Sequence, residues 1–510
     1  MLRGIVYQRQ SDLWETCGQA DSSARHGIGK DVHSSLRKKK HQRKWDLTDE
    51  RIPPLRVVFH LTWPLFLEQV LTTLVSYADT AMVGALGVQA TASVSITNPF
   101  VFLINGVVMA LGVGITSYVA RSVGAKDYEA AKAYIRHALL LLVCVGLPMC
   151  LLILLLHRQI PLWMGAAPDI IESSANYLKI TSIFRIGALT TMMLSSVFRG
   201  RGDMKTPLYI NAGVNVLNIV GNYLLINPSH VISLGSLRIP IPGAGLGIAG
   251  AALSTGFSWL TGGALMIAFL YLKDDPTRIH LREPIHPDWG VIRRVVSISI
   301  PAMLERFCLS GASIVVGRAV ASLGTVVYAA NSVYITAESI SFMPGFAFAT
   351  TATTLTGQSL GAKKPYLAKR YVAYTAAAGM TILSITGTMI YFFAPVLVRL
   401  FTPDAVAMAI AVDCLHEVAF IQPIQVAGWI IAGALRGAGD TRWPFYITAT
   451  CNWLIRTLGA YVCIRVLHLG LPQAVLCACV DSCVSAFVLW LRYRSGRWIH
   501  AIRDHAAKAA

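Results

Sequence analysis

The chain alternates long apolar runs with short polar segments, and the lengths of these runs predict helices that cross a membrane. A helix needs roughly 20 apolar residues to span a bilayer. Twelve runs qualify, with approximate limits 57–83, 92–118, 134–156, 170–196, 207–227, 246–272, 293–319, 327–354, 371–393, 405–433, 443–465 and 471–491. Backbone in lipid must satisfy its own hydrogen bonds, so each run is expected to be an α-helix. The pattern therefore predicts an all-α polytopic membrane protein with twelve transmembrane helices.

The second half of the chain repeats the first. Residues 301–463 align with 64–226 at a constant offset of 237 and without a gap. The matched pairs include Pro64 with Pro301, Glu68 with Glu305, Gly124-Ala-Lys126 with Gly361-Ala-Lys363, Arg199 with Arg436, Asp203 with Asp440, and Asn215 with Asn452. Each copy holds an even number of spans, so both enter the membrane in the same direction. We expect two parallel six-helix repeats around a central cleft, with alternating access by rocking of one lobe against the other.

The repeat and the polar segments divide the chain into five parts. We predict a basic, disordered cytoplasmic tail over 1–55, an N-lobe of helices 1–6 over 56–272, a cytoplasmic linker over 273–292, a C-lobe of helices 7–12 over 293–493, and a cytoplasmic C-terminal tail over 494–510. The linker is polar and contains three prolines, as expected of a connection between two helical bundles.

Charge fixes the predicted orientation. Only 14% of residues are charged, against about 25% in soluble proteins, and the formal net charge is +18. Lys and Arg concentrate in alternate loops, which the positive-inside rule places in the cytoplasm together with both termini. We expect a bacterial inner (plasma) membrane protein that contacts lipids but not nucleic acid. The basic run near residue 40 is then a solvated segment or a contact with anionic headgroups. The cysteines lack the spacing of a metal site.

The polar residues that break the repeat are the strongest functional candidates. A charge inside a span is costly unless it is paired, hydrated or neutralised, so an ionisable residue there indicates a function. Asp79 lies in the outer half of the first span, where its counterpart is Val316. In the fifth span, Asn218 and Asn222 have the counterparts Ile455 and Gly459. An Asp beside amide oxygens can hold Na⁺ or a proton. We predict cation coupling at Asp79, Asn218 and Asn222, although the two asparagines could instead only join neighbouring helices.

Other polar groups in the spans are candidates for lining the cavity. Glu68 lies about 16 Å along the helix from Asp79, too far for the two acids to share one proton. Asn215 follows the same face of the fifth span as Asn218 and Asn222. Glu305 could bind substrate or pair with Arg306 or Arg456, and Glu338 is specialised because its counterpart is Val101. The matched loops Arg199–Asp203 and Arg436–Asp440 contain Arg-Gly-x-Gly-Asp and are predicted to be tight turns with structural or gating roles.

With twelve spans in two homologous halves, the motif Asp79-Thr-Ala-Met-Val-Gly84, the Gly124-Ala-Lys loop and the paired Arg-Gly-x-Gly-Asp loops, the chain resembles the multidrug and toxic compound extrusion (MATE) family over residues 53–493. Its features are mixed NorM-like and DinF-like. The resemblance implies that Asp79 is the coupling acid and that Asn218 and Asn222 belong to its cation pocket. Glu305 resembles a seventh-span acid of the NorM-like branch. Gln422 and Gln425 stand near that branch's tenth-span acid, which makes Gln425 a cavity candidate.

The resemblance implies a Na⁺- or H⁺-coupled antiporter that exports amphipathic, cationic organic compounds. We expect a monomer without a cofactor or bound metal, apart from Na⁺ at Asp79 if Na⁺ is the coupling ion. The alternative is a lipid-linked sugar flippase of the same superfamily, which would need cationic residues such as Arg306 and Arg456 exposed in the cavity. An enzyme is not expected, because the chain lacks the sequence motifs of metalloproteases, serine hydrolases and P-loop NTPases.

Overall fold

The computed structural model describes residues 46–501, apart from 235–236, 281–282, 284–285 and 403. The predicted tail falls mainly on residues 1–45, which lie outside the described residues, as do 502–510 of the predicted C-terminal tail. The described residues from 50 onwards form one compact unit, to which the following description applies.

The first six predicted spans are helical, two of them in more than one piece. They correspond to α3 (Pro54–Gly84), α4 with α5 (Val88–Ser95 and Asn98–Gly124), α6 with η1 and α7 (Tyr128–Leu141, Leu142–Gly146 and Leu147–Leu156), α9 (Ile171–Arg201), α10 (Lys205–Ile226) and α11 (Ile248–Leu272). A short helix, α8 (Gln159–Trp163), precedes α9. The antiparallel strands β1 (Pro228–Leu234) and β2 (Leu237–Ala244), which were not predicted, connect α10 to α11.

The last six predicted spans are helical as well. They correspond to α12 (Trp289–Ala321), α13 (Thr325–Gly361), α14 (Pro365–Arg399), α15 (Ala405–Gly437), α16 with η2 and α17 (Arg442–Cys451, Asn452–Thr457 and Leu458–Arg465) and α18 (Leu471–Arg494). A 3₁₀ turn, η3 (Arg497–His500), follows. Among the described residues, ten helices are long and apolar enough to cross a membrane. The other two predicted spans are also helical, in α13 and in the α16–η2–α17 segment. The predicted all-helical, polytopic fold class is confirmed.

Local sequence explains where several of these helices bend or end. Pro99 is among the first residues of α5 and follows the turn that separates α4 from α5. The side chain of Asp127 caps α6 by accepting a hydrogen bond from the Ala130 amide. Gly202, just past the end of α9, and Gly439, just past α15, both have φ of 84°, a conformation that glycine adopts without strain. The predicted tight turns at the two Arg-Gly-x-Gly-Asp loops are therefore confirmed.

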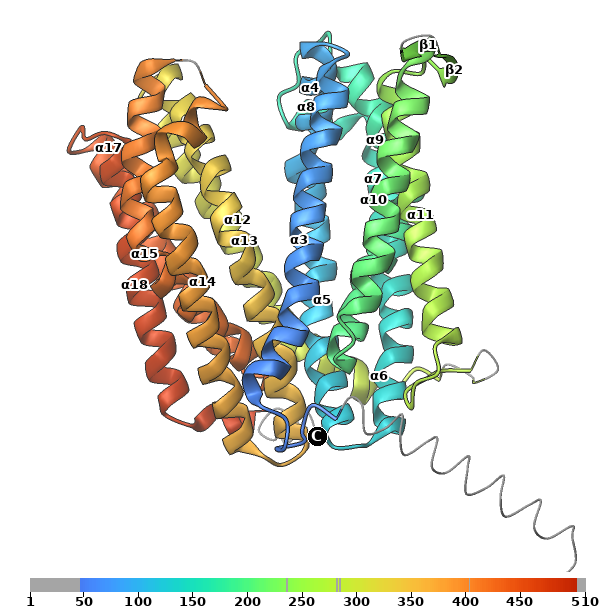
Figure 1. Ribbon diagram of the computed structural model, residues 1–510, viewed down its shortest axis with the longest axis vertical. Helices are drawn as coiled ribbons and strands as arrows, with labels where there is room; N and C mark the ends of the chain where they lie inside the picture. Colours follow the sequence, from blue (N-terminus) through green and yellow to red (C-terminus); the bar gives the residue numbers. More distant parts are fainter. Residues whose placement is uncertain (1–45, 235–236, 281–282, 284–285, 403, 502–510) are drawn as a thin grey trace, which may run out of the picture. The chain divides into compact units, whose positions relative to one another are not determined.

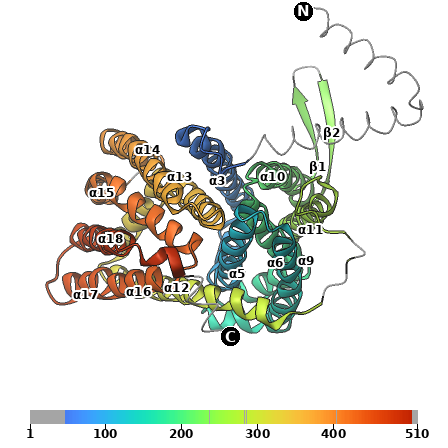
Figure 2. The ribbon, with the colours of Figure 1, turned by 90° about the horizontal axis from the view of Figure 1, so that it is seen from below.

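The helices form two groups that follow the order of the chain. Helices α3–α11 gather on one side and α12–α18 on the other (Figures 1 and 2). A buried apolar core in the first group joins α5, α6 and α9, and another in the second joins α12, α13, α15 and α18.

Glu50, just before α3, pairs with Lys364 at 2.6 Å, and hydrogen bonds from Lys364 and Tyr366 hold the pKa of Glu50 below its ordinary value.

Helices α5 and α13 cross closely near the ends that carry Gly124 and Gly361. A Cβ atom on Gly124 would lie 2.0 Å from the Gln358 carbonyl oxygen, and one on Gly361 would lie 2.0 Å from that of Arg121. Gly124 and Gly361 are repeat counterparts, and so are Arg121 and Gln358. The contact is therefore reciprocal, as expected when two copies of one unit meet across a pseudo-twofold axis.

Hydrogen bonds between the two groups show the same reciprocity. The Ser117 hydroxyl donates to the Arg436 carbonyl at 2.6 Å, and its counterpart Thr354 donates to the Arg199 carbonyl at 3.0 Å. The Gln358 side-chain amide also donates to the Gly200 carbonyl at 3.0 Å. The carbonyls come from the ends of α9 and α15, so the beginning of each Arg-Gly-x-Gly-Asp loop is held by the opposite half of the chain.

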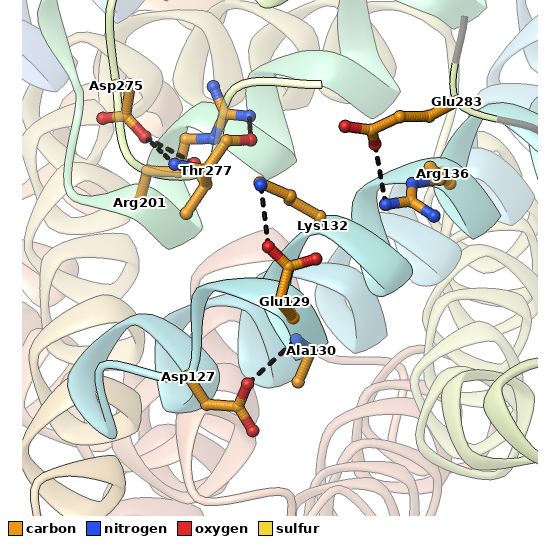
Figure 3. Close-up of polar contacts among 9 residues, drawn as sticks. All are labelled: Asp127, Glu129, Ala130, Lys132, Arg136, Arg201, Asp275, Thr277 and Glu283. Atoms are coloured by element: carbon orange, nitrogen blue, oxygen red, sulfur yellow. Dashed lines mark hydrogen bonds and ion pairs between the residues drawn. The ribbon is translucent and has the colours of Figure 1, made fainter. Parts of the chain in front are cut away.

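The predicted linker is attached to the first helical group. The Arg201 guanidinium donates to the Thr277 carbonyl at 3.0 Å, and Arg136 pairs with Glu283 at 2.7 Å (Figure 3). Side-chain and backbone groups of Thr277 also donate to Asp275, which closes a small turn (Figure 3). The ring of His137 accepts a hydrogen bond from the Asp288 amide at 2.9 Å. The described residues of the linker thus contact the first helical group before α12 begins.

Candidate functional site

Asp79 of α3 and the two asparagines of α10 lie together, as the sequence predicted. Asn222 donates to the Asp79 carboxylate through Nδ2 at 2.6 Å. Asn218 lies one turn earlier on the same face of α10, and both amides are buried, at 5% and 1% exposure for Asn218 and Asn222. Residues four apart on an α-helix lie on the same face, so both amides can contact one carboxylate.

The hydrogen-bond network sets the orientation of the Asn218 amide. With its nitrogen towards Asp79, Nδ2 donates to the two carboxylate oxygens at 2.7 and 3.1 Å, and its oxygen accepts from the Thr255 hydroxyl of α11 at 3.2 Å. The opposite orientation would place the amide oxygen against the carboxylate, two acceptors facing each other. The site therefore joins α3, α10 and α11.

Asp79 has no cationic partner in the part of the chain that the structure describes. No Lys, Arg or His lies within ion-pair distance of its carboxylate in the described part of the chain. The Asn222 side-chain oxygen is buried beside it and has no hydrogen-bond partner among the described residues. The half-buried carboxylate, the spare amide oxygen and the Thr255 hydroxyl form a small group of oxygen atoms of the kind that hold Na⁺ or a proton.

Glu68 has a different environment although it lies on the same helix. Its carboxylate accepts from the Arg199 guanidinium at 2.9 Å and from the Asn211 amide at 2.7 Å. The Glu68 side chain is only 6% exposed and that of Arg199 26%. Glu68 is thus neutralised by a fixed partner, which makes it a support for the end of α9 rather than an open binding group.

Glu305 repeats this arrangement in the second half. It pairs with Arg436 at 2.5 Å, the repeat counterpart of the Glu68–Arg199 pair. The expectation that Glu305 would pair with Arg306 or Arg456 is therefore wrong. Arg436 reaches Glu305 from the end of α15, 131 residues further along the chain.

The acids of the two glycine loops bind the last helices of their own halves. Asp203 pairs with Lys273 at 2.5 Å, just after α11, and also accepts from the Thr206 hydroxyl. Asp440 accepts two hydrogen bonds from Arg492 of α18, at 2.9 and 2.7 Å. Each loop is thus held by an acid to its own lobe and by a carbonyl to the other lobe.

The remaining cavity candidates are dispersed. Glu338 of α13 lies within interaction range of Tyr334 and Arg456. Asn215 lies one turn before Asn218, and its Nδ2 has no hydrogen-bond partner among the described residues. The Gln425 side-chain oxygen in α15 is also buried and unpartnered in the same part of the chain. These three residues do not join the Asp79 group.

Two features of the site were missed from the sequence. Thr255 completes the Asn218 contact, but a single threonine in an apolar span carries no signal of its own. The second is a pocket in the C-terminal group lined by Arg456, which is exposed there, while Arg306 is half-buried. The sequence signal that could have found the pocket is Arg456, which breaks the repeat because its counterpart is Ile219.

Comparison with known proteins agrees with the repeat. The MatE family model matches residues 64–224 and 301–462, the two repeated copies. The probable multidrug resistance protein NorM of Thermotoga maritima is 27% identical over 459 residues, which cover 89% of this chain and 95% of that protein. The multidrug resistance protein MdtK of Yersinia pseudotuberculosis is 26% identical over 439 residues, covering 82% and 89%.

Solved structures share the fold. A multidrug resistance MATE family transporter in an outward-facing conformation superposes with a TM-score of 0.80 at 22% identity, over 89% of this chain and 98% of that one. A MATE protein in a bent conformation gives 0.79 at 21% identity, over 91% and 98%. The two family matches together span more than half of the sequence, and the chain therefore belongs to the MatE family of multi-pass membrane transporters.

Proposed function

We propose that the protein is a cation-coupled antiporter that exports amphipathic, cationic organic compounds in exchange for Na⁺ or H⁺. The observation that carries the proposal is the Asp79 carboxylate, which two buried amides hold and no cationic side chain in the described residues neutralises. A charge in the membrane is costly without a counter-charge. Glu68 and Glu305 have arginines for this purpose, whereas Asp79 leaves the place of the counter-ion open.

Competition for Asp79 would produce the exchange. One carboxylate supports one positive charge, so the coupling ion and the cationic substrate bind the N-lobe in turn. Binding of one lowers the affinity for the other by the same factor, as linkage requires. After the ion has left and before the substrate binds, the amide donors of Asn218 and Asn222 stabilise the ionised carboxylate. This competition is the step by which an ion gradient drives export.

Alternating access would use the reciprocal contact between α5 and α13. The Lys- and Arg-rich loops adjoin this contact, so the positive-inside rule makes it the cytoplasmic closure. We infer an outward-facing state of a protein in the bacterial plasma membrane, with both termini in the cytoplasm. Rocking would separate Gly124 from Gln358 and Gly361 from Arg121, and would release the carbonyls of the two glycine loops.

Substrate adaptability is supported by aromatic side chains at the middle of α13. Phe346 stacks on Trp429 of α15 with ring centroids 4.8 Å apart, and Phe342 packs edge-on against both. Flat, polarizable surfaces of this kind accept amphipathic ring systems of different shape. The multidrug resistance names of the relatives agree with such a substrate class. They do not favour the lipid-linked sugar flippase.

Gradient-driven efflux of a fluorescent lipophilic cation from proteoliposomes tests this function. Na⁺ and H⁺ gradients are imposed separately on wild type, Asp79→Asn and the control Glu172→Gln. The exposed Glu172 carboxylate meets Arg158 at 3.9 Å and Asn176 at 3.5 Å. We expect one of the two gradients to drive efflux in wild type and in the control, and neither to do so in Asp79→Asn. Equal efflux by Asp79→Asn would overturn the assignment, and no ion-driven efflux by folded wild type would overturn the antiporter.

A further inference from the structure

A pocket in the C-terminal helices occupies the position that the repeat assigns to the Asp79 site. Val316 of α12, the counterpart of Asp79, lines it together with Ser313, the counterpart of Ser76. Helix α13 contributes Asn331, and η2 contributes Asn452 and Arg456. The Asp79 group of the N-lobe and the pocket of the C-lobe thus lie at equivalent positions of the repeat, but the acid of the first is replaced by valine in the second.

Arg456 gives the second pocket the opposite charge. Its repeat counterpart is Ile219, so the guanidinium is specific to the C-lobe. The residue is exposed in the pocket, and no ion pair to it is formed among the described residues. It lies in the π-helical segment η2, an irregularity that is common at functional sites and that changes the direction of the following side chains.

The acids near Arg456 are occupied by other partners and do not line the pocket. Glu338 interacts with the Tyr334 hydroxyl. Asp481 interacts with Asn452 and accepts from the Ser485 hydroxyl at 3.2 Å. Both acids also interact electrostatically with Arg456 and favour its charged form. The guanidinium has five N–H groups, and no hydrogen bond from it is formed among the described residues. No hydrogen bond from the Asn331 amide occurs within the described residues, so a second donor is free beside it.

We propose that this pocket binds the carboxylate of a zwitterionic amphipathic substrate, with Arg456 as its principal ligand. A planar carboxylate matches the fork of a guanidinium, and Asn331 supplies a further N–H group. The side chains of Val316, Val320 and Ile335 give the pocket apolar walls. The inference rests on the proposed transport function: Asp79 receives the cationic end of a substrate, and the C-lobe receives its anionic end.

Binding of a matched pair of probes tests the inference. The probes are an aromatic amine that carries a carboxylate and the methyl ester of the same compound, with affinities measured on the purified full chain in lipid nanodiscs. We expect wild type to bind the acid roughly tenfold more tightly than the ester, the worth of a charge-assisted hydrogen bond. Arg456→Gln removes this preference and Arg456→Lys retains part of it. The control Arg465→Gln, an exposed arginine near the end of α17, leaves it unchanged.

A second variant and a transport readout keep the inference separate from folding and from the transport proposal. Asn331→Ala leaves every charge in place and is expected to reduce the preference, even if Arg456→Gln proves unstable in thermal melting. Ion-driven efflux of the ester should persist in Arg456→Gln. Equal binding of acid and ester by wild type, or an unchanged preference in folded Arg456→Gln or Asn331→Ala, would overturn the carboxylate site while ester efflux still supports the antiporter. Absence of ester efflux in wild type counts against the antiporter alone.

Discussion

At the scale of single residues, the partner of each acid in the spans decides what that acid can do. Glu68 and Glu305 have nearly the same burial as each other and each faces an arginine. Asp79 is less buried, and its hydrogen-bond partners among the described residues are amides. A carboxylate that is neutralised by a fixed arginine does not need to bind a further cation. A carboxylate that has only amide donors can bind an ion and a cationic substrate in turn. The two kinds of acid therefore have different roles on one helix.

Removing the acid of the Glu68–Arg199 pair should destabilise the fold. Glu68→Gln leaves the Arg199 charge, 26% exposed, without its counter-charge, and breaking a buried ion pair from one side costs roughly 3–5 kcal/mol. We expect thermal melting of the purified protein to fall by several degrees, roughly in line with that loss. Glu172→Gln, which removes an exposed partner of Arg158, should melt like wild type. Equal melting of both variants would show that the pair is not structural.

Removing an amide donor should impair exchange without removing the acid. Asn222→Ala deletes the 2.6 Å bond to Asp79, so the ion-free carboxylate that admits the cationic substrate becomes rarer. A hydrogen bond to a charged group is worth about 1.5–3 kcal/mol, and ion-driven efflux should fall roughly tenfold or more. Asn176→Ala, at an exposed asparagine 3.5 Å from Glu172, is the matched control. Efflux by Asn222→Ala at the level of this control would exclude a part for the amide in coupling.

The sequence predicted the Asp79 group because its members break the repeat at helical spacing within two segments. It did not predict that Arg199 meets Glu68 or that Arg436 meets Glu305. Each of these pairs joins residues 131 apart in the chain, and their contact depends on how two helices are rotated against each other. Local pattern sets which face of a helix is polar, but packing sets which polar faces meet.

At the scale of helices, the crossing of α5 and α13 depends on two glycines that the repeat relates. Both positions lack room for a methyl group, because backbone of the other helix lies 2.0 Å from the place of the Cβ atom. Close helix contacts in membranes use small residues for this reason. The same two helices carry the Ser117 and Thr354 hydroxyls that bind the opposite loops, so the crossing and the loops should open together.

Alanine at these glycines should open the crossing. In Gly124→Ala and Gly361→Ala the added methyl group overlaps the Gln358 or Arg121 backbone, and we expect longer distances between spin labels placed at the ends of α5 and α13. Gly213→Ala is the control, since nothing lies within 4 Å of its added Cβ atom. Distance distributions that match the control in both variants would mean that the crossing does not hold the two lobes in this state.

The sequence predicted the twelve long helical segments, ten of which are long and apolar enough to cross a membrane among the described residues. Roughly 20 apolar residues leave a strong local signal. It missed the β1–β2 hairpin, whose strands have only 7 and 8 residues. Pro240 and Pro242 lie within β2, and prolines argue against a strand unless its free edge accepts them. A two-stranded ribbon has such an edge on each strand. The π-helical segments η1 and η2 were also missed, since one inserted residue does not disturb the apolar pattern.

At the scale of the whole molecule, the distribution of Lys and Arg predicts which end faces the cytoplasm. A membrane-impermeant maleimide applied to intact cells should label Leu469→Cys, in the loop between α17 and α18, but not Glu129→Cys at the start of α6. Both positions are accessible to solvent in the folded protein, with exposures of 38% for Leu469 and 77% for the Glu129 side chain. Permeabilised cells supply the control, in which both label. The reverse pattern in intact cells would invert the proposed orientation.

The two lobes share a fold but not a chemistry. The repeat preserves the Glu–Arg pairs, the glycine loops and the α5–α13 crossing, which all hold helices together. It does not preserve Asp79, Asn218 and Asn222, whose counterparts are apolar residues and a glycine, nor Arg456, whose counterpart is Ile219. Matched residues thus hold the structure, and the unmatched polar residues are where we place ion and substrate binding.

Release of the coupling ion on addition of substrate tests the exchange at Asp79 most directly. Purified protein in weakly buffered solution receives a lipophilic cation while free Na⁺ and pH are followed. We predict that wild type releases about one monovalent cation per substrate bound, because the two compete for one carboxylate, and that Asp79→Asn releases none. Substrate binding by wild type without ion release, or the same release from Asp79→Asn, would contradict competition at this residue.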